Sequence, residues 1–100
     1  MTGYNRNREF CRIADSWQKA TRHLSSPSDK YEHRDYQKII EMGEEIIPVL
    51  LLNTRSFRST DWICALETIT KENPVPVEHA GNTEMLRHYW LKWGEEKGYL

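Results

Sequence analysis

The residues that could carry out chemistry are histidines, cysteines and carboxylates, and their spacing decides whether they can form a site. Four histidines are present: His23, His33, His79 and His88. No two of them are four residues apart on a predicted helix, which is the spacing of paired zinc ligands in metalloprotease helices. Glu84 and His88 have that spacing, but a single pair needs further ligands and more often forms a surface ion pair or hydrogen bond. We therefore expect no metal site.

A nucleophile with a base would require Cys64 and His79 to meet in the fold. Cys64 lies beside Trp62 and Ala65 on the predicted buried side of a helix, where a structural thiol is expected. Cys11 and Cys64 are the only cysteines and follow no C-x-x-C pattern, which predicts two reduced thiols in apolar surroundings. Three carboxylates gather at a predicted helix junction, as capping charges do: Glu41, Glu44 and Glu45. The sequence predicts no catalytic residue and no cofactor.

Length and composition indicate one small folded domain over residues 1–100. Of the 100 residues, 38% are hydrophobic and four are tryptophan, which is too apolar for a disordered chain. The net charge of −1 gives no chain-wide attraction to nucleic acid or to an anionic membrane. The N-terminus has no signal-peptide hydrophobic region, and the longest apolar run, residues 46–52, is too short to span a bilayer. We expect a cytoplasmic protein without a membrane partner.

Apolar residues recur at three- and four-residue spacing, which predicts an all-α fold of about five helices. The first helix is expected over about residues 6–24 and the last over about 83–98. Three more are expected within about residues 33–70, with Gly43 as a left-handed C-cap. Pro74 is expected to end the fourth helix by pushing Asn73 out of helical geometry. Gly98 is expected to cap the last helix, with Tyr99 packing behind it.

Residues 72–82 hold two of the four prolines and one of the five glycines, between the last two predicted helices. A phosphate-binding loop needs several consecutive N–H groups aimed at an anion, and two prolines remove such donors. A stiff linker with Val75 or Val77 packed on the neighbouring helices loses little entropy on folding. We interpret this segment as a proline-rich strut.

Five segments of the sequence, in this order along the chain, resemble segments of a family of small uncharacterised bacterial proteins: "WQKATRHLSS", "YQKIIEMGEEIIPVLL", "DWICALETITKENPVP", "GNTEML" and "WLKWGEEKGY". The likeness runs from about Trp17 onward, with Lys71 where that family has a glycine and Arg34 where it has a proline. The central unit is also similar to one and a half HEAT-type repeats. The resemblance implies a HEAT-like helical hairpin core over about residues 33–70 and a recognition role.

Charge is distributed unevenly along the chain. Residues 1–24 hold five cations against two acids, whereas residues 25–45 hold three cations against six acids. The first helix is therefore expected to present a basic face: Arg6, Arg8, Arg12, Lys19 and Arg22. This face either opposes an acidic one, in the fold or in a partner, or contacts a nucleic-acid backbone. Phe57 or Tyr4 would then stack on a base, beside Arg55 and Arg58.

Small cores seldom bury every tryptophan fully, and tryptophan is enriched at binding hot spots. Trp17 and Trp93 are candidate partner contacts, with core packing as the alternative for each. The remaining candidates are Phe57, Arg55 and Arg58.

The sequence predicts a non-enzymatic protein–protein interaction module that binds another protein, expected to be a larger subunit. The expected setting is an accessory or regulatory role in a bacterial system such as toxin control or phage defence. The alternative is a nucleic-acid-binding accessory protein that uses the basic face of the first helix. An enzyme that uses the cysteines and histidines is the third interpretation.

Overall fold

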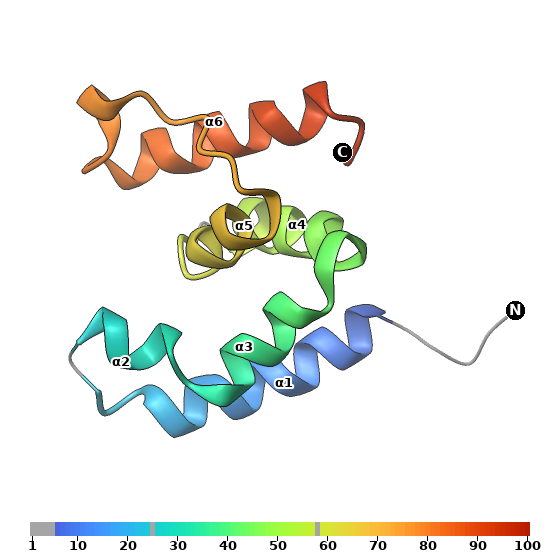
Figure 1. The fold of residues 1–100 in the computed structure, drawn as a ribbon, viewed down its shortest axis with the longest axis vertical. Helices are drawn as coiled ribbons and strands as arrows, with labels where there is room; N and C mark the ends of the chain where they lie inside the picture. The colour runs from blue at the N-terminus through green and yellow to red at the C-terminus, as the bar shows by residue number, and fades with distance from the viewer. Residues whose placement is uncertain (1–5, 25, 58) are drawn as a thin grey trace, which may run out of the picture. The chain divides into compact units, whose positions relative to one another are not determined.

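The computed structural model describes residues 6–24, 26–57 and 59–100, and every regular element in these ranges is helical (Figure 1). The predicted all-α fold is confirmed. The elements in chain order are α1 (Arg6–Thr21), α2 (Pro27–Tyr31), α3 (Arg34–Glu41), the 3-10 turn η1 (Gly43–Ile46), α4 (Ile47–Phe57), α5 (Ile63–Thr70), the 3-10 turn η2 (Val77–His79) and α6 (Thr83–Glu96).

The chain divides into two compact units, of which the first ends at Ile46 and the second begins at Ile47. This division falls inside residues 33–70, the segment that the sequence analysis treats as one HEAT-like core within a single domain. The HEAT-like hairpin stays a prediction, and each unit is described by itself.

In the first unit, α1 and α3 lie side by side, and η1 packs against both (Figure 1). The apolar stripe of α1 is buried as predicted at Phe10, Ile13, Ala14 and Trp17, and α3 buries Tyr36 and Ile39. The stripe is shorter than expected, because Ala20 is exposed and α1 ends at Thr21 rather than near residue 24.

A short helix, α2, lies between α1 and α3, outside the segments for which helices are predicted. Pro27 lies in its first turn, where the missing N–H leaves no helical hydrogen bond unmade, and Asp29 adds a favourable negative charge there.

Two helix ends follow the predicted glycine chemistry. Gly43 and Gly98 have φ angles of 70° and 85°, in the left-handed region that glycine adopts without strain. At Gly98 the N–H donates to Glu95 O at 3.3 Å, and Tyr99 N–H donates to Gly94 O at 2.8 Å, which is the Schellman pattern. The Tyr99 ring stacks on Trp93, with the ring centroids 5.6 Å apart.

Helix α5 is short, with eight residues. It begins at Ile63, and in the turn before it Ser59 Oγ accepts the N–H of Asp61. It ends at Thr70, because Lys71 adopts the left-handed conformation with φ 58°. Asn73 lies outside the helix, as expected for the residue before Pro74. Asn73 instead forms a turn in which its Oδ1 accepts the N–H of Val75 at 3.1 Å.

In the second unit, α4 and α6 pack together, and a glycine at the contact allows the close approach. Gly94 of α6 is buried, and a Cβ at this position would lie 2.7 Å from Leu51 Cδ1 and 3.2 Å from Leu100 Cδ1. Leu51 is itself fully buried, so its side chain has no open space to move into. The α4–α6 contact therefore requires a residue without a side chain at position 94.

The strut joins α5 to α6 and is tied to α6. Pro76 has φ −60° and ψ 148°, in the polyproline region, and Val75 is buried while Val77 is exposed. Trp93 Nε1 of α6 donates to Glu72 Oε1 at 3.2 Å. Asn82 then caps α6 by accepting the Met85 N–H at its Oδ1. One valine of the pair packs, as expected for a linker that fixes its neighbours.

Replacing Gly94 by alanine tests the close contact. Alanine favours a helix over glycine by about 1 kcal/mol, but overpacking a filled core costs about 1–3 kcal/mol. We expect Gly94→Ala to lower the free energy of unfolding by about 1 kcal/mol in urea denaturation. Gly81→Ala is the control, because no heavy atom lies within 4 Å of a Cβ there. A Gly94→Ala protein at least as stable as Gly81→Ala would contradict the close packing.

Replacing Lys71 by glycine tests the strain of the left-handed residue. Glycine relieves a side-chain clash of about 1–2 kcal/mol but adds about 0.4–1 kcal/mol of unfolded-state entropy. We expect Lys71→Gly to raise the free energy of unfolding by up to about 1 kcal/mol. Lys97→Gly is the matched control, because Lys97 also follows a helix but has φ −87°, so glycine should destabilise there. Equal shifts of the two urea midpoints would speak against strain at Lys71.

Candidate functional site

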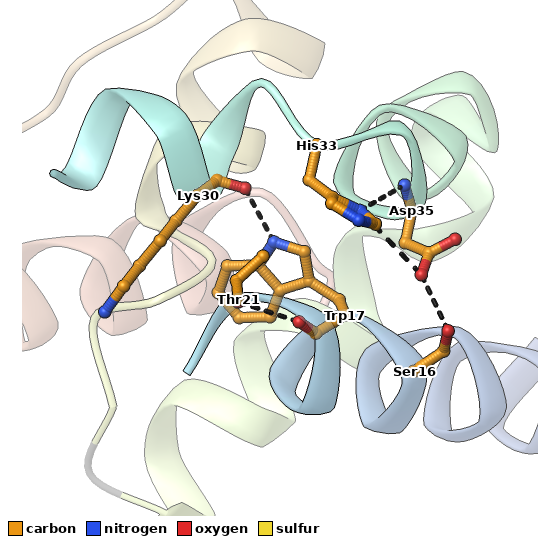
Figure 2. Close-up of polar contacts among 6 residues, drawn as sticks. All are labelled: Ser16, Trp17, Thr21, Lys30, His33 and Asp35. Carbon is orange, nitrogen blue, oxygen red and sulfur yellow. Dashed lines mark hydrogen bonds and ion pairs between the residues drawn. The ribbon is translucent and has the colours of Figure 1, made fainter. Parts of the chain in front are cut away.

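Trp17 lies at the centre of the first unit and holds α2 against α1. Its Nε1 donates to Lys30 O at 2.7 Å (Figure 2). Its ring stacks on Tyr31 and packs at an angle on Tyr36. Only 3% of its surface is exposed. The indole therefore fills the core of this unit, and the expected partner contact at Trp17 is not available in this structure.

Beside Trp17, three residues of catalytic type come together: Ser16, His33 and Asp35. Ser16 Oγ donates to Asp35 Oδ2 at 2.8 Å, and Asp35 N–H donates to His33 Nδ1 at 3.1 Å (Figure 2). His33 is thereby the N-cap of α3. The buried Asp35 carboxylate links the start of α3 to α1.

The order of these hydrogen bonds differs from that of a catalytic triad. In a triad the serine donates to the histidine, which takes the proton, and the carboxylate orients the histidine from the other side. Here the serine donates to the carboxylate, and His33 Nδ1 accepts a backbone N–H. Ser16 has no base in this arrangement, so the cluster connects two helices rather than activating a nucleophile. The pairing of Ser16 with Asp35 escapes sequence analysis because 19 residues separate them.

Trp93 is buried in the second unit, with 6% of its surface exposed. It packs edge-to-face on Trp90, stacks on Tyr99 and donates its Nε1–H to Glu72. Like Trp17, it has both apolar cover and an acceptor for its indole N–H. Trp93 therefore fixes the strut and the C-terminal turn instead of facing a partner.

Among the aromatic candidates in the described residues, Phe57 alone lies at the surface, with 73% of it exposed. Tyr4 lies outside the described residues. It is three residues after Thr54 and seven after Leu50, so it continues the stripe of α4 whose other members are buried. Arg55 is also exposed, on the other side of the helix, and Arg58 lies outside the described residues.

The end of α4 that carries Phe57 is held by α6. Arg87 Nε donates to Thr54 O at 3.3 Å, one turn before Phe57, and the same guanidinium bonds Glu84 Oε1 at 2.6 Å. The Arg87 side chain is largely buried. The backbone from which Phe57 projects is therefore fixed, a contact for which the sequence has no local signal because 33 residues separate Arg87 from Thr54.

The basic residues of α1 form a row on its outer side. We name this row the outer stripe of α1: Arg8, Arg12, Asp15, Lys19 and Arg22. All five residues are exposed. Arg22 follows the helix directly, and its N–H continues the helical pattern by donating to Gln18 O. Arg6 begins α1, but its side chain lies outside the described part of the structure.

Two cations of the outer stripe pair with acids of the same helix. Arg12 donates to Glu9, and Lys19 Nζ lies 3.1 Å from Asp15 Oδ2. The hydrogen bond that Arg12 donates to Glu9, and then the negative charge of Glu9, raise the pKa of Arg12. Both pairs are exposed and hence of little consequence for stability.

The other residues of chemical interest are dispersed. Cys11 is exposed on α1, which corrects the expected apolar packing, and Cys64 is half-buried on α5. His79 stacks on Tyr89. Burial raises the pKa of Glu67 on α5, without a charged neighbour as a cause.

The described ranges contain no group of three or more His, Cys, Asp or Glu side chains placed to hold a metal ion. Nor do these ranges contain a helix long and apolar enough to cross a membrane.

Comparisons with known proteins do not assign the chain to a family. No model of a protein family matches it. No curated protein and no solved structure is significantly similar to it. The resemblance to small bacterial proteins therefore stays a prediction, and the function has to be argued from the residues themselves.

Proposed function

We propose that the chain is a non-enzymatic protein-binding module that docks a larger partner subunit through the end of α4, with Phe57 as the anchor. The observation that carries the proposal is the exposure of Phe57 on a helix stripe whose preceding members are buried. A residue at that position of the helical repeat is normally buried. A partner that supplies an apolar pocket would extend the core over it.

The fixed position of α4 favours such a role. Burying an exposed phenylalanine contributes about 1.5–3 kcal/mol, and a side chain with two rotatable bonds loses little entropy when it docks. The hydrogen bond from Arg87 to Thr54 holds the helix end in place before binding.

An enzyme is less well supported than a binding module. The described residues of catalytic type that gather are Ser16, His33 and Asp35, and their hydrogen bonds leave the serine without a base. This arrangement favours a structural role for the cluster. A recognition function then rests on the exposed surface rather than on a reaction centre.

The contrast between Trp17 and Phe57 separates core from contact residues. We expect Trp17→Ala to lower the free energy of unfolding by about 3–5 kcal/mol, as truncation of a buried aromatic does. Phe57→Ala should lower it by less than about 1 kcal/mol, because most of the ring is already in water. Urea denaturation of both variants measures the difference. If Phe57→Ala is as destabilising as Trp17→Ala, Phe57 belongs to the core and the proposed anchor is wrong.

Site-specific photocrosslinking tests the docking surface. The photoreactive analogue p-benzoylphenylalanine replaces Phe57, and the matched control places it at Glu95, an exposed position on α6 of the same unit. In cells of the native host we expect one protein to be crosslinked from position 57 but not from position 95.

Competition then decides whether that adduct is specific. Excess wild-type protein should suppress it, whereas excess Phe57→Ser protein should not. Identical adducts from both positions, or equal suppression by both competitors, would refute Phe57 as the anchor.

A further inference from the structure

The outer stripe of α1 differs in chemistry from the end of α4 and belongs to the other unit. We propose that this stripe binds the sugar–phosphate backbone of a nucleic acid. The inference goes beyond the docking of a protein on Phe57 and does not rest on it.

The geometry of the stripe is linear. With about 3.6 residues per turn, Arg8, Arg12, Asp15, Lys19 and Arg22 fall within an arc of about 80°. The row from Arg8 to Arg22 is about 21 Å long, at about 1.5 Å per residue. A duplex rises about 3.4 Å per base pair along its axis, so the row is as long as about six base pairs. The phosphates of each strand wind around that axis, so a straight row of cations contacts a few of them where it crosses the backbone.

The composition of the stripe distinguishes this ligand from a protein. Protein interfaces have an apolar core within a polar rim. The exposed large hydrophobic side chains of the described chain are Leu52, Phe57 and Val77, and none of them is on α1. A phosphate backbone needs no such core, and three of the four cations are arginine, whose planar guanidinium can donate two hydrogen bonds to a phosphate.

The inner face of α1 holds the row in place. Trp17, which is bonded to Lys30 O, and Ser16, which is bonded to Asp35, fix the helix against α2 and α3. The cations therefore project from a rigid backbone. Their ion pairs to Glu9 and Asp15 are exposed, so phosphates can replace these acids as partners.

Asp15 sets the strength of binding, because it lies in the middle of the row and repels phosphate. The stripe has four cations and this one acid, and Glu9 lies beside it. We therefore expect weak, strongly salt-dependent binding without base preference. The stripe has no aromatic side chain on which bases could stack, so a single strand gains nothing over a duplex.

Fluorescence anisotropy with a labelled DNA duplex of about 20 base pairs, in salt from about 50 to about 200 mM, tests the proposal. If binding neutralises about two to three phosphates, a plot of the logarithm of the affinity against the logarithm of the salt concentration should have a slope of about −2 to −3. Arg8→Glu/Arg12→Glu should weaken binding by about tenfold or more. Asp15→Asn should strengthen it by about two- to threefold, which a merely structural helix would not do.

The controls make each outcome decisive. Arg34→Glu/Lys38→Glu changes the charge equally on exposed residues of α3 in the same unit and should leave binding unchanged. Phe57→Ser should also bind DNA normally, so the two proposals can fail separately. Three outcomes would overturn the nucleic-acid assignment. The wild-type protein fails to bind the duplex, the α3 variant weakens binding as much as the α1 variant does, or polyglutamate of the same charge competes as well as unlabelled DNA. The last outcome would favour an acidic protein instead.

Discussion

The constraint on which this structure depends is the shortness of its helices. Helices α2, α3 and α5 have five, eight and eight residues, and isolated helices below about 12 residues are marginal in water. Their ends must therefore be fixed by contacts from elsewhere. Trp17 donates to the last turn of α2, Ser16 and His33 hold the first turn of α3 through Asp35, and Lys71 closes α5. Polar side chains that might suggest a reaction centre are used here to hold helix ends.

Features that depend on nearby residues could be predicted, whereas those that depend on distant ones could not. The buried stripe of Phe10, Ile13 and Trp17, and the left-handed Gly43 and Gly98, follow from local spacing and local backbone chemistry. The link between Ser16 and Asp35, and that between Arg87 and Thr54, join segments whose proximity only the fold decides. The left-handed conformation of Lys71 could not be predicted either, because glycine is the residue that usually adopts it.

The tryptophans and Phe57 show why side-chain type alone does not identify a surface. An indole can be buried without loss when its N–H finds an acceptor, and both Trp17 and Trp93 have one, at Lys30 O and Glu72 Oε1. Phenylalanine needs no acceptor and would be easier to bury. Phe57 nevertheless lies in water because α4 ends there, beyond the residues that cover Leu50 and Thr54. The place where the helix ends, rather than hydrophobicity or helical register, thus leaves this side chain exposed.

Energetics limit what Phe57 can do alone. Burying one phenylalanine contributes about 1.5–3 kcal/mol, whereas micromolar affinity needs about 8 kcal/mol. A partner must therefore contact more of the second unit than this ring. Leu52 and Arg55 are exposed on the opposite side of α4 from Phe57, so a partner that reaches all three has to surround the end of the helix. A pocket that encloses a helix end fits this requirement better than a flat surface, because only the former covers both sides of α4 at once.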